Sequence, residues 1–266
     1  MTKRVISAVV MVAIILPFVI YGKLPFAIMM SVLSVGGLYE LMNIRESKKE
    51  FPKVMKIIAY LLVVFFTMIN SSSNDFQYDI NYKVISIIIF SFIVPLVFIN
   101  DNKKYNLNDA LFLVGSILFV GLSFNLLVVT RNISITYFIY LFLITIVTDS
   151  FALFTGMLVG KHKLAPLISP KKTIEGAVGG SLMGTFVATA FYVTVINPGV
   201  SLVLLILATL LLSVVGQIGD LAFSSIKRYY GKKDFSDLIP GHGGILDRFD
   251  SVVFVAMAFV ILFGII

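Results

Sequence analysis

The sequence has no cysteine and few charged residues. Of its 266 residues, 13% are Asp, Glu, Lys or Arg, whereas 59% are hydrophobic. The absence of cysteine excludes disulfides and thiolate metal sites. Soluble domains are usually about 45–50% apolar. The apolar excess therefore excludes an ordinary soluble core and favours several segments of about 20 residues that cross a hydrocarbon layer about 30 Å thick.

Unbroken apolar runs recur along the whole chain, and they do not alternate as barrel strands would. Inside a bilayer the backbone must satisfy its own hydrogen bonds, which leaves helices or a closed barrel. We therefore predict an all-α integral membrane protein of about nine transmembrane helices. The predicted helices cover residues 5–21, 24–39, 54–69, 84–99, 110–129, 136–159, 177–196, 200–226 and 245–266.

Basic residues divide unevenly between the two sides of this arrangement. With the N-terminus in the cytoplasm, 18 of the 21 lysine and arginine residues fall on the inner side, and only Lys23, Lys83 and Arg131 fall outside. Cytoplasmic loops carry such an excess, so we predict a cytoplasmic N-terminus and an outer C-terminus. There is no long basic arm, and we do not expect a nucleic-acid partner.

The chain is predicted to form a single polytopic membrane domain over residues 1–266. No soluble domain is inserted, and no repeat is obvious. Residues 1–133 read mainly as scaffold helices. Residues 134–266 hold the polar motifs and are predicted to provide the catalytic helices and cytoplasmic loops.

The predicted helix 200–226 carries a stripe of polar side chains spaced three or four residues apart, so that they share one face. Such a face either lines a polar cavity or packs against another helix through Ser and Gln, and both interpretations stay open for Ser213. A buried carboxylate at Asp220 requires a cation. The stripe consists of Ser213, Gln217, Asp220, Ser224 and Lys227.

The stretch "GHGGILDRFD", residues 241–250, precedes the last apolar run. Asp247 and Asp250 are three residues apart and lie on one side of a helix. Glycines permit close backbone approach to a ligand, and a helix N-terminus attracts anions. Mg²⁺ is commonly held by one or two carboxylates plus substrate phosphates. We predict a metal site of Asp220, Asp247 and Asp250; alternatively, the last two are capping residues and Arg248 is an interfacial anchor.

Another inner loop, "GKHKLAPLISPKKTIEGAVGG", offers Lys171 and Lys172 as phosphate partners, although a positive-inside loop would also contain lysines. Asp149, within a predicted span, either faces the same cavity or pairs with a lysine. Glu40, near the inner end of the second helix, and His162 are interpreted as interfacial and surface residues. The sequence holds neither a Ser–His–Asp arrangement nor a Walker loop.

The stretch "SSIKRYYGKKDFSDLIPGHGGILDRFDS", residues 224–251, resembles the signature of bacterial phosphatidate cytidylyltransferases, also called CDP-diacylglycerol synthases. "SPKKTIEG", residues 169–176, and the pair Gly219–Asp220 are also similar to that family. The motif serine corresponds to Ser225. The likeness covers roughly the last 100 residues and shows no departure from the motif.

This resemblance implies that CTP and phosphatidate react to give CDP-diacylglycerol and diphosphate in phospholipid biosynthesis. It also implies Mg²⁺ dependence, with room for a second, monovalent cation, a homodimer, and a polar cavity open to the cytoplasm and to membrane lipid. The expected location is the bacterial plasma membrane, which the chain crosses several times.

The same resemblance implies roles for particular residues. The catalytic residues would be Asp220, Lys227, Asp247 and Asp250, with the three aspartates as metal ligands. The substrate-binding residues would be Ser169, Lys171, Lys172, Thr173, Glu175, Ser225, Arg228, Lys233, His242, Gly243, Gly244 and Arg248.

Two other functions are weighed against this one. CDP-alcohol phosphotransferases also use clustered aspartates, but their pattern, Asp-Gly-x-x-Ala-Arg followed by Gly-x-x-x-Asp-x-x-x-Asp, is absent. An ion transporter would use Asp149 and Asp220 as its path. Transporters often have two related halves with broken helices at mid-membrane, whereas here the charges gather at one face near the C-terminus.

Overall fold

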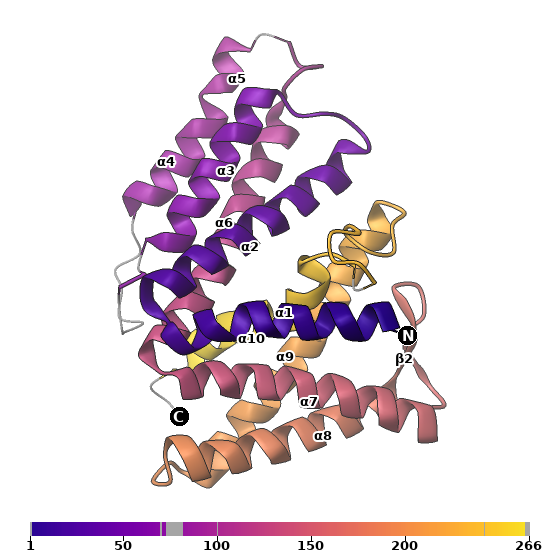
Figure 1. Cartoon of the computed structure of the whole chain (residues 1–266). Helices are drawn as coiled ribbons and strands as arrows, with labels where there is room; N and C mark the ends of the chain where they lie inside the picture. The colour runs from indigo at the N-terminus through magenta and orange to yellow at the C-terminus, as the bar shows by residue number, and fades with distance from the viewer. Residues whose placement is uncertain (1, 70, 73–81, 100, 242, 264–266) are drawn as a thin grey trace. The chain divides into compact units, whose positions relative to one another are not determined.

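A computed structural model describes residues 2–69, 71–72, 82–99, 101–241 and 243–263, with side chains from residue 9 onward. The described chain is mostly helical, as the sequence predicts (Figure 1). Its elements are α1 (Thr2–Tyr21), α2 (Lys23–Glu46), α3 (Lys53–Met68), α4 (Tyr82–Ile93), α5 (Pro95–Phe98), α6 (Leu107–Ile133), α7 (Ile135–Val159), β1 (Lys163–Ala165), β2 (Ser169–Thr173), α8 (Ile174–Phe191), a π-helical turn η1 (Tyr192–Ile196), α9 (Leu202–Tyr229) and α10 (Leu246–Leu262).

Within the described residues, five helices are long and apolar enough to cross a membrane: α2, α6, α7, α8 with its π-helical turn, and α9. The described chain is therefore mostly helical apart from the hairpin of β1 and β2, and its long apolar helices fit the predicted multi-pass membrane protein. Of the other predicted spans, α1 has 20 residues, and α3, α4 and α10 are shorter. The 16 residues of α3 rise about 24 Å, below the roughly 30 Å of a hydrocarbon layer. A proline at the first position of α5 separates it from α4, because proline has no backbone N–H to donate.

Packing divides the chain into two units. Unit 1 comprises Met1–Asn132 and Asp234–Leu246, and unit 2 comprises Ile133–Lys233 and Asp247–Ile266. The segment Asp234–Leu246 therefore packs with the N-terminal helices, although it lies in the C-terminal part of the sequence. The assignment of scaffold and catalytic roles to residues 1–133 and 134–266 stays a prediction.

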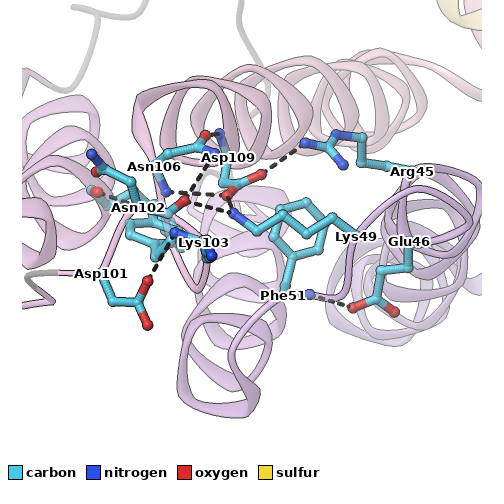
Figure 2. A network of polar contacts seen from close by, with 11 residues as sticks. Arg45, Glu46, Lys49, Phe51, Asp101, Asn102, Lys103, Asn106 and Asp109 are labelled. Carbon is cyan, nitrogen blue, oxygen red and sulfur yellow. Dashed lines mark hydrogen bonds and ion pairs between the residues drawn. The ribbon is translucent and has the colours of Figure 1, made fainter.

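In unit 1, a polar network connects the end of α2 to the start of α6 (Figure 2). Asp109, whose side chain is 1% exposed, accepts from Arg45 Nη2 at 2.8 Å and also pairs with Lys49. Asp109 and Asn106 cap the helix reciprocally, each side chain accepting from the other's backbone N–H at 3.1 Å. The two basic residues neutralise a carboxylate that burial alone would disfavour.

Tyr105 precedes this helix start and is fully buried. Its hydroxyl donates to the carbonyl oxygen of Phe92 at 3.0 Å. Burial, and then the nearby negative charge of Asp109, raise the pKa of the Tyr105 phenol. The phenol therefore remains a neutral hydrogen-bond donor that holds the connection after α5 against α4.

In unit 2, α7 and α8 run side by side along a seam of glycines (Figure 1). Gly176, Gly180 and Gly184 are four residues apart, so they form one stripe on α8. A Cβ atom on Gly176 would lie 2.6 Å from the carbonyl oxygen of Ala152, and one on Gly180 would lie 2.5 Å from that of Thr148. Small residues of this kind let membrane helices approach closely.

Gly180→Ala is predicted to destabilise the protein by about 1–3 kcal/mol, because the new methyl group meets a backbone carbonyl that cannot move away freely. Gly115→Ala is the matched control, since a Cβ atom there has nothing within 4 Å. That change should be neutral or slightly stabilising. The thermal unfolding midpoint in detergent is measured for both variants. Equal midpoints would contradict a role of the glycine seam in helix packing.

Candidate active site

The hairpin β1–β2 presents the predicted phosphate-binding lysines. Its strands are antiparallel, with Lys163 opposite Thr173 and Ala165 opposite Ser169. Thr173 ends the hairpin and caps α8, its hydroxyl accepting from the backbone N–H of Gly176 at 3.1 Å. A β-region residue with a side-chain oxygen is the usual N-cap. The hairpin is therefore joined directly to the start of a membrane-spanning helix.

Glu175 connects the two ends of this hairpin. Its carboxylate accepts from the backbone N–H groups of Lys161 and His162 at 3.1–3.2 Å and contacts His162 Nδ1 at 2.6 Å. His162 is exposed, in agreement with its interpretation as a surface residue. Thr173 and Glu175 thus have clear structural partners, and their predicted contact with substrate stays a prediction.

The N-terminal part of the polar stripe on α9 packs against neighbouring helices. Ser213 Oγ lies 2.8 Å from Thr148 Oγ1 and 3.2 Å from Ser181 Oγ. Gln217 Nε2 donates to Ser181 Oγ at 2.7 Å and to the carbonyl oxygen of Ala177 at 3.1 Å. Of the two interpretations of Ser213, the structure supports the packing seam. Because hydrocarbon offers no water, these hydroxyl and amide groups form their hydrogen bonds with one another across the helices.

Further along the same face, Asp220 pairs with a lysine from the hairpin. Lys172 Nζ lies 2.5 Å from Asp220 Oδ2, and the two side chains are 26% and 25% exposed. Ser224 Oγ donates to Asp220 Oδ1 at 3.3 Å. The cation that a carboxylate in this helix requires is therefore Lys172, which the sequence predicted only as a phosphate partner.

A second lysine–aspartate pair lies at the end of the stripe. Lys227 Nζ is 2.7 Å from Asp247 Oδ1, and the side chains are only 8% and 4% exposed. Removing water from both charges is costly, and leaving either one alone costs more. The pair joins the last turn of α9 to the first turn of α10. Two predicted catalytic residues are thus in direct contact.

Asp149 and Asp250 complete the acidic cluster of unit 2. The negative charge of Asp220 acts on both of them, and that of Asp149 also acts on Asp250. Close approach is possible because a Cβ atom on Gly219 would lie 2.8 Å from the carbonyl oxygen of Asp250. Asp149, for which the sequence left a cavity and a lysine partner open, has both Asp220 and Lys172 as electrostatic neighbours. It belongs with the candidate site.

Among the described residues, no three histidine or acidic side chains converge closely enough to hold a metal ion. The donor chemistry nevertheless suits Mg²⁺, which prefers carboxylate oxygens. In this structure Lys172 and Lys227 occupy the carboxylates of Asp220 and Asp247. A metal that replaced the lysines at those oxygens would leave each lysine to pair with another anion, and the metal site stays a prediction.

Arg228 also has structural partners. Its Nε donates to the carbonyl oxygen of Ile168 in the hairpin turn at 3.1 Å, and its Nη1 donates to that of Lys232 at 2.7 Å. The guanidinium thereby connects the hairpin to the end of α9. The other predicted substrate ligands of unit 2 with exposed side chains are Lys171, Ser225, Lys233 and Arg248, whereas Ser169 is half-buried.

The glycine-rich part of the signature folds within unit 1. Gly241 and Gly243 have φ of 79° and 81°, a left-handed conformation that glycine adopts without strain. The backbone N–H of Ile239 donates to the carbonyl oxygen of Gly243 at 2.9 Å and closes the turn. Gly244 is buried. The predicted ligand His242 lies outside the described residues.

Sequence reasoning missed Glu40, which was expected at the interface. It is fully buried and accepts from Ser236 Oγ at 2.6 Å and from the backbone N–H groups of Ile245 and Leu246 at 2.7 and 2.8 Å. These two amides therefore serve a carboxylate of the protein, not a phosphate. An acidic residue in an apolar helix, shortly after Gly36 and Gly37, was the available signal.

Comparison with known proteins identifies relatives over nearly the whole chain. Three curated relatives, from Staphylococcus haemolyticus, Staphylococcus saprophyticus and Staphylococcus aureus, are each named phosphatidate cytidylyltransferase. Each is 36% identical to this chain, and each alignment covers 96% of both proteins. The family described as the cytidylyltransferase family matches residues 2–266. Extended over nearly the whole sequence, this similarity shows that the chain belongs to the cytidylyltransferase family.

Proposed function

We propose that this protein is a phosphatidate cytidylyltransferase, which converts CTP and phosphatidate into CDP-diacylglycerol and diphosphate. A phosphate oxygen of phosphatidate attacks the α-phosphorus of CTP. The bond from that phosphorus to the oxygen bridging it to the β-phosphorus breaks, and diphosphate leaves with that oxygen. A phosphate monoester is already largely ionised at neutral pH, since its second pKa is about 6. No strong base is therefore needed to generate the nucleophile.

The observation that carries this proposal is the pair of lysine–aspartate contacts in unit 2. Lys172–Asp220 and Lys227–Asp247 bring together two cations and two carboxylates from the hairpin strand β2, from α9 and from the first turn of α10. Phosphoryl-type transfer depends mainly on positioning and on stabilising negative charge. A site with both charge types suits a reaction between two phosphate-bearing substrates.

The lysines are proposed to exchange partners when substrate binds. Lys172 and Lys227 would turn from their aspartates to phosphate oxygens, and Asp220 and Asp247 would then be free to accept a different cation. Asp220, Asp247 and Asp250 would hold Mg²⁺, which would supply positive charge to offset the negative charge that develops on the phosphate groups. The monovalent second cation stays a prediction from the family resemblance.

The exposed basic residues are proposed to guide the substrates. Lys233 and Arg228 would hold the triphosphate or the leaving diphosphate. Lys171 and Arg248 would meet the phosphatidate headgroup or the nucleotide. CTP arrives from water and phosphatidate from the bilayer, so a charged site at the cytoplasmic end of the helices serves both.

Several finer features belong to the same proposal. We infer nine transmembrane spans, a cytoplasmic N-terminus, a polar cavity open to the cytoplasm, a homodimer and the plasma membrane of a bacterial cell. The five long apolar helices and the bacterial relatives support a multi-pass membrane protein. The basic residues of the inner loops support the orientation.

Purified protein in detergent with Mg²⁺, phosphatidate and radiolabelled CTP is predicted to form a lipid-soluble labelled product and release diphosphate in equal amounts. Chelation of Mg²⁺ should stop the reaction, and its readdition should restore it. CDP-diacylglycerol is identified by mass spectrometry. Absence of product across several detergents and acyl chains would contradict the proposed reaction.

Asp220→Asn is predicted to lower kcat by about 100-fold or more, because a group that stabilises phosphate charge through the metal is lost. Asp247→Asn alone leaves Lys227 buried without its carboxylate, so Asp247→Asn is combined with Lys227→Met to keep the site neutral. Asp101→Asn, at a 43% exposed side chain, is the control. Activity and unfolding midpoint are measured for all; near-normal activity of a folded variant removes that residue from the site.

Single cysteines report the orientation cleanly, because the chain has none of its own. Lys233→Cys is predicted to react with a membrane-impermeant maleimide only from the cytoplasmic side. Gly199→Cys, in the connection before α9, should react only from the outside. Both positions are exposed. Labelling of both from one side would show that α9 does not cross the membrane.

A further inference from the structure

Glu40 is a charged residue in the middle of unit 1 to which the proposed reaction assigns no role. It lies on α2, an otherwise apolar helix whose last turn carries Arg45. Its side chain has no exposed surface. A buried carboxylate is retained only where hydrogen-bond donors compensate for the lost water. Its donors therefore identify what it does.

Three described donors to Glu40 come from both ends of one loop. Ser236 Oγ donates to Glu40 Oε1 at 2.6 Å, near the start of the segment Asp234–Leu246. The backbone N–H groups of Ile245 and Leu246 donate to Oε1 and Oε2 at 2.7 and 2.8 Å, at its end. One carboxylate thus brackets residues 236–246, which include the glycine turn of the signature.

The same contact determines where α10 begins. Ile245 and Leu246 supply N–H groups at the N-terminus of that helix, where backbone amides have no partner within the helix. Glu40 acts as a cap from a distant part of the chain, and its negative charge complements the positive end of the helix dipole. Asp247, the next residue, is one of the predicted catalytic residues.

The backbone around the bracket is packed without spare room. A Cβ atom on Gly37 would lie 2.9 Å from the Leu246 side chain, and one on Gly36 would overlap that of Ile245. A Cβ atom on Gly244 would lie 2.5 Å from Glu40 Oε1. Glycines on both sides therefore allow the loop to approach α2, and the carboxylate fixes it at that distance.

Ser236 extends the bracket into the loop. Besides donating to Glu40, its Oγ accepts from the backbone N–H of Leu238 at 3.2 Å. The next residue, Ile239, pairs with Gly243 across the turn. Hydrogen bonds at Ser236, Leu238 and Ile239 thus follow one another along the loop from the carboxylate toward the glycine turn.

We propose that Glu40 is a positioning residue for the cytidylyl transfer: by bracketing residues 236–246 and capping α10, it holds the glycine turn and the start of the aspartate-bearing helix in their working conformation. This inference rests on the proposed function. In this proposal Glu40 does not contact the phosphatidate oxygen or the α-phosphorus of CTP. It acts through the loop that it holds.

The test uses three variants in the full-length protein. Glu40→Gln keeps the shape but replaces one acceptor oxygen with an NH₂ group that faces donors. Ser236→Ala releases only the first end of the loop. Glu50→Gln changes an exposed residue just beyond α2 and is the matched control. Each variant is characterised by its unfolding midpoint, by hydrogen–deuterium exchange resolved by peptide, and by steady-state kinetics for CTP and Mg²⁺.

We expect faster exchange in the peptide covering residues 236–246 of Glu40→Gln, with exchange of α6 unchanged. The kcat/KM for CTP should fall by roughly 10- to 100-fold, because a displaced loop loses productive geometry, and Mg²⁺ half-saturation should rise. Ser236→Ala should show a smaller change of the same kind, and Glu50→Gln none.

Two results would overturn the proposal. One is unchanged exchange and kinetics in Glu40→Gln. The other is faster exchange throughout unit 1 with a lower midpoint but an unchanged KM for CTP and Mg²⁺ half-saturation, which indicates a purely structural residue. If the wild-type protein forms no CDP-diacylglycerol, the proposed function fails, whereas exchange confined to residues 236–246 still supports the bracket.

Discussion

A charge placed among membrane-spanning helices needs an opposite charge or a full set of hydrogen bonds, because hydrocarbon supplies neither. Unit 2 meets this requirement with lysine–aspartate pairs, of which Lys227–Asp247 is almost completely enclosed. Such pairs add little net stability compared with apolar side chains of similar size. The proposed function gives them a chemical use, because a lysine and an aspartate already brought together away from water are suited to exchanging partners with a phosphate and a metal ion.

The pairs depend on less conspicuous local structure. Lys172 reaches Asp220 from a hairpin strand whose end is capped by Thr173 and whose base is closed by Glu175. Close α7–α8 packing along the glycine seam sets the position from which this hairpin leaves the membrane-spanning region. The glycine seam, the Thr173 cap and the Glu175 hydrogen bonds therefore act together to position the ammonium group of Lys172.

Much of the helical arrangement follows from the sequence. Long apolar runs predicted α2 and α6–α9, and the spacing of polar residues placed Ser213 through Lys227 on one face of α9. Helical spacing does not specify the neighbour of each face, so it did not reveal that Lys172 pairs with Asp220. The partners of Glu40 could not be predicted either, because two of its donors are backbone amides about 200 residues away. A backbone amide is present at almost every position and gives no signal in the sequence.

The order of the segments of the two units along the chain has a consequence for biogenesis. Unit 1 takes its last segment, Asp234–Leu246, from a stretch translated after nearly all of unit 2. Domains generally fold as units, N-terminal parts first, as the ribosome releases them. Here the N-terminal helices must insert while the partner of Glu40 has yet to be synthesised. Glu40 therefore receives these donors only after residues 133–233 have been synthesised, and truncation shortly before Asp234 would leave both units incomplete.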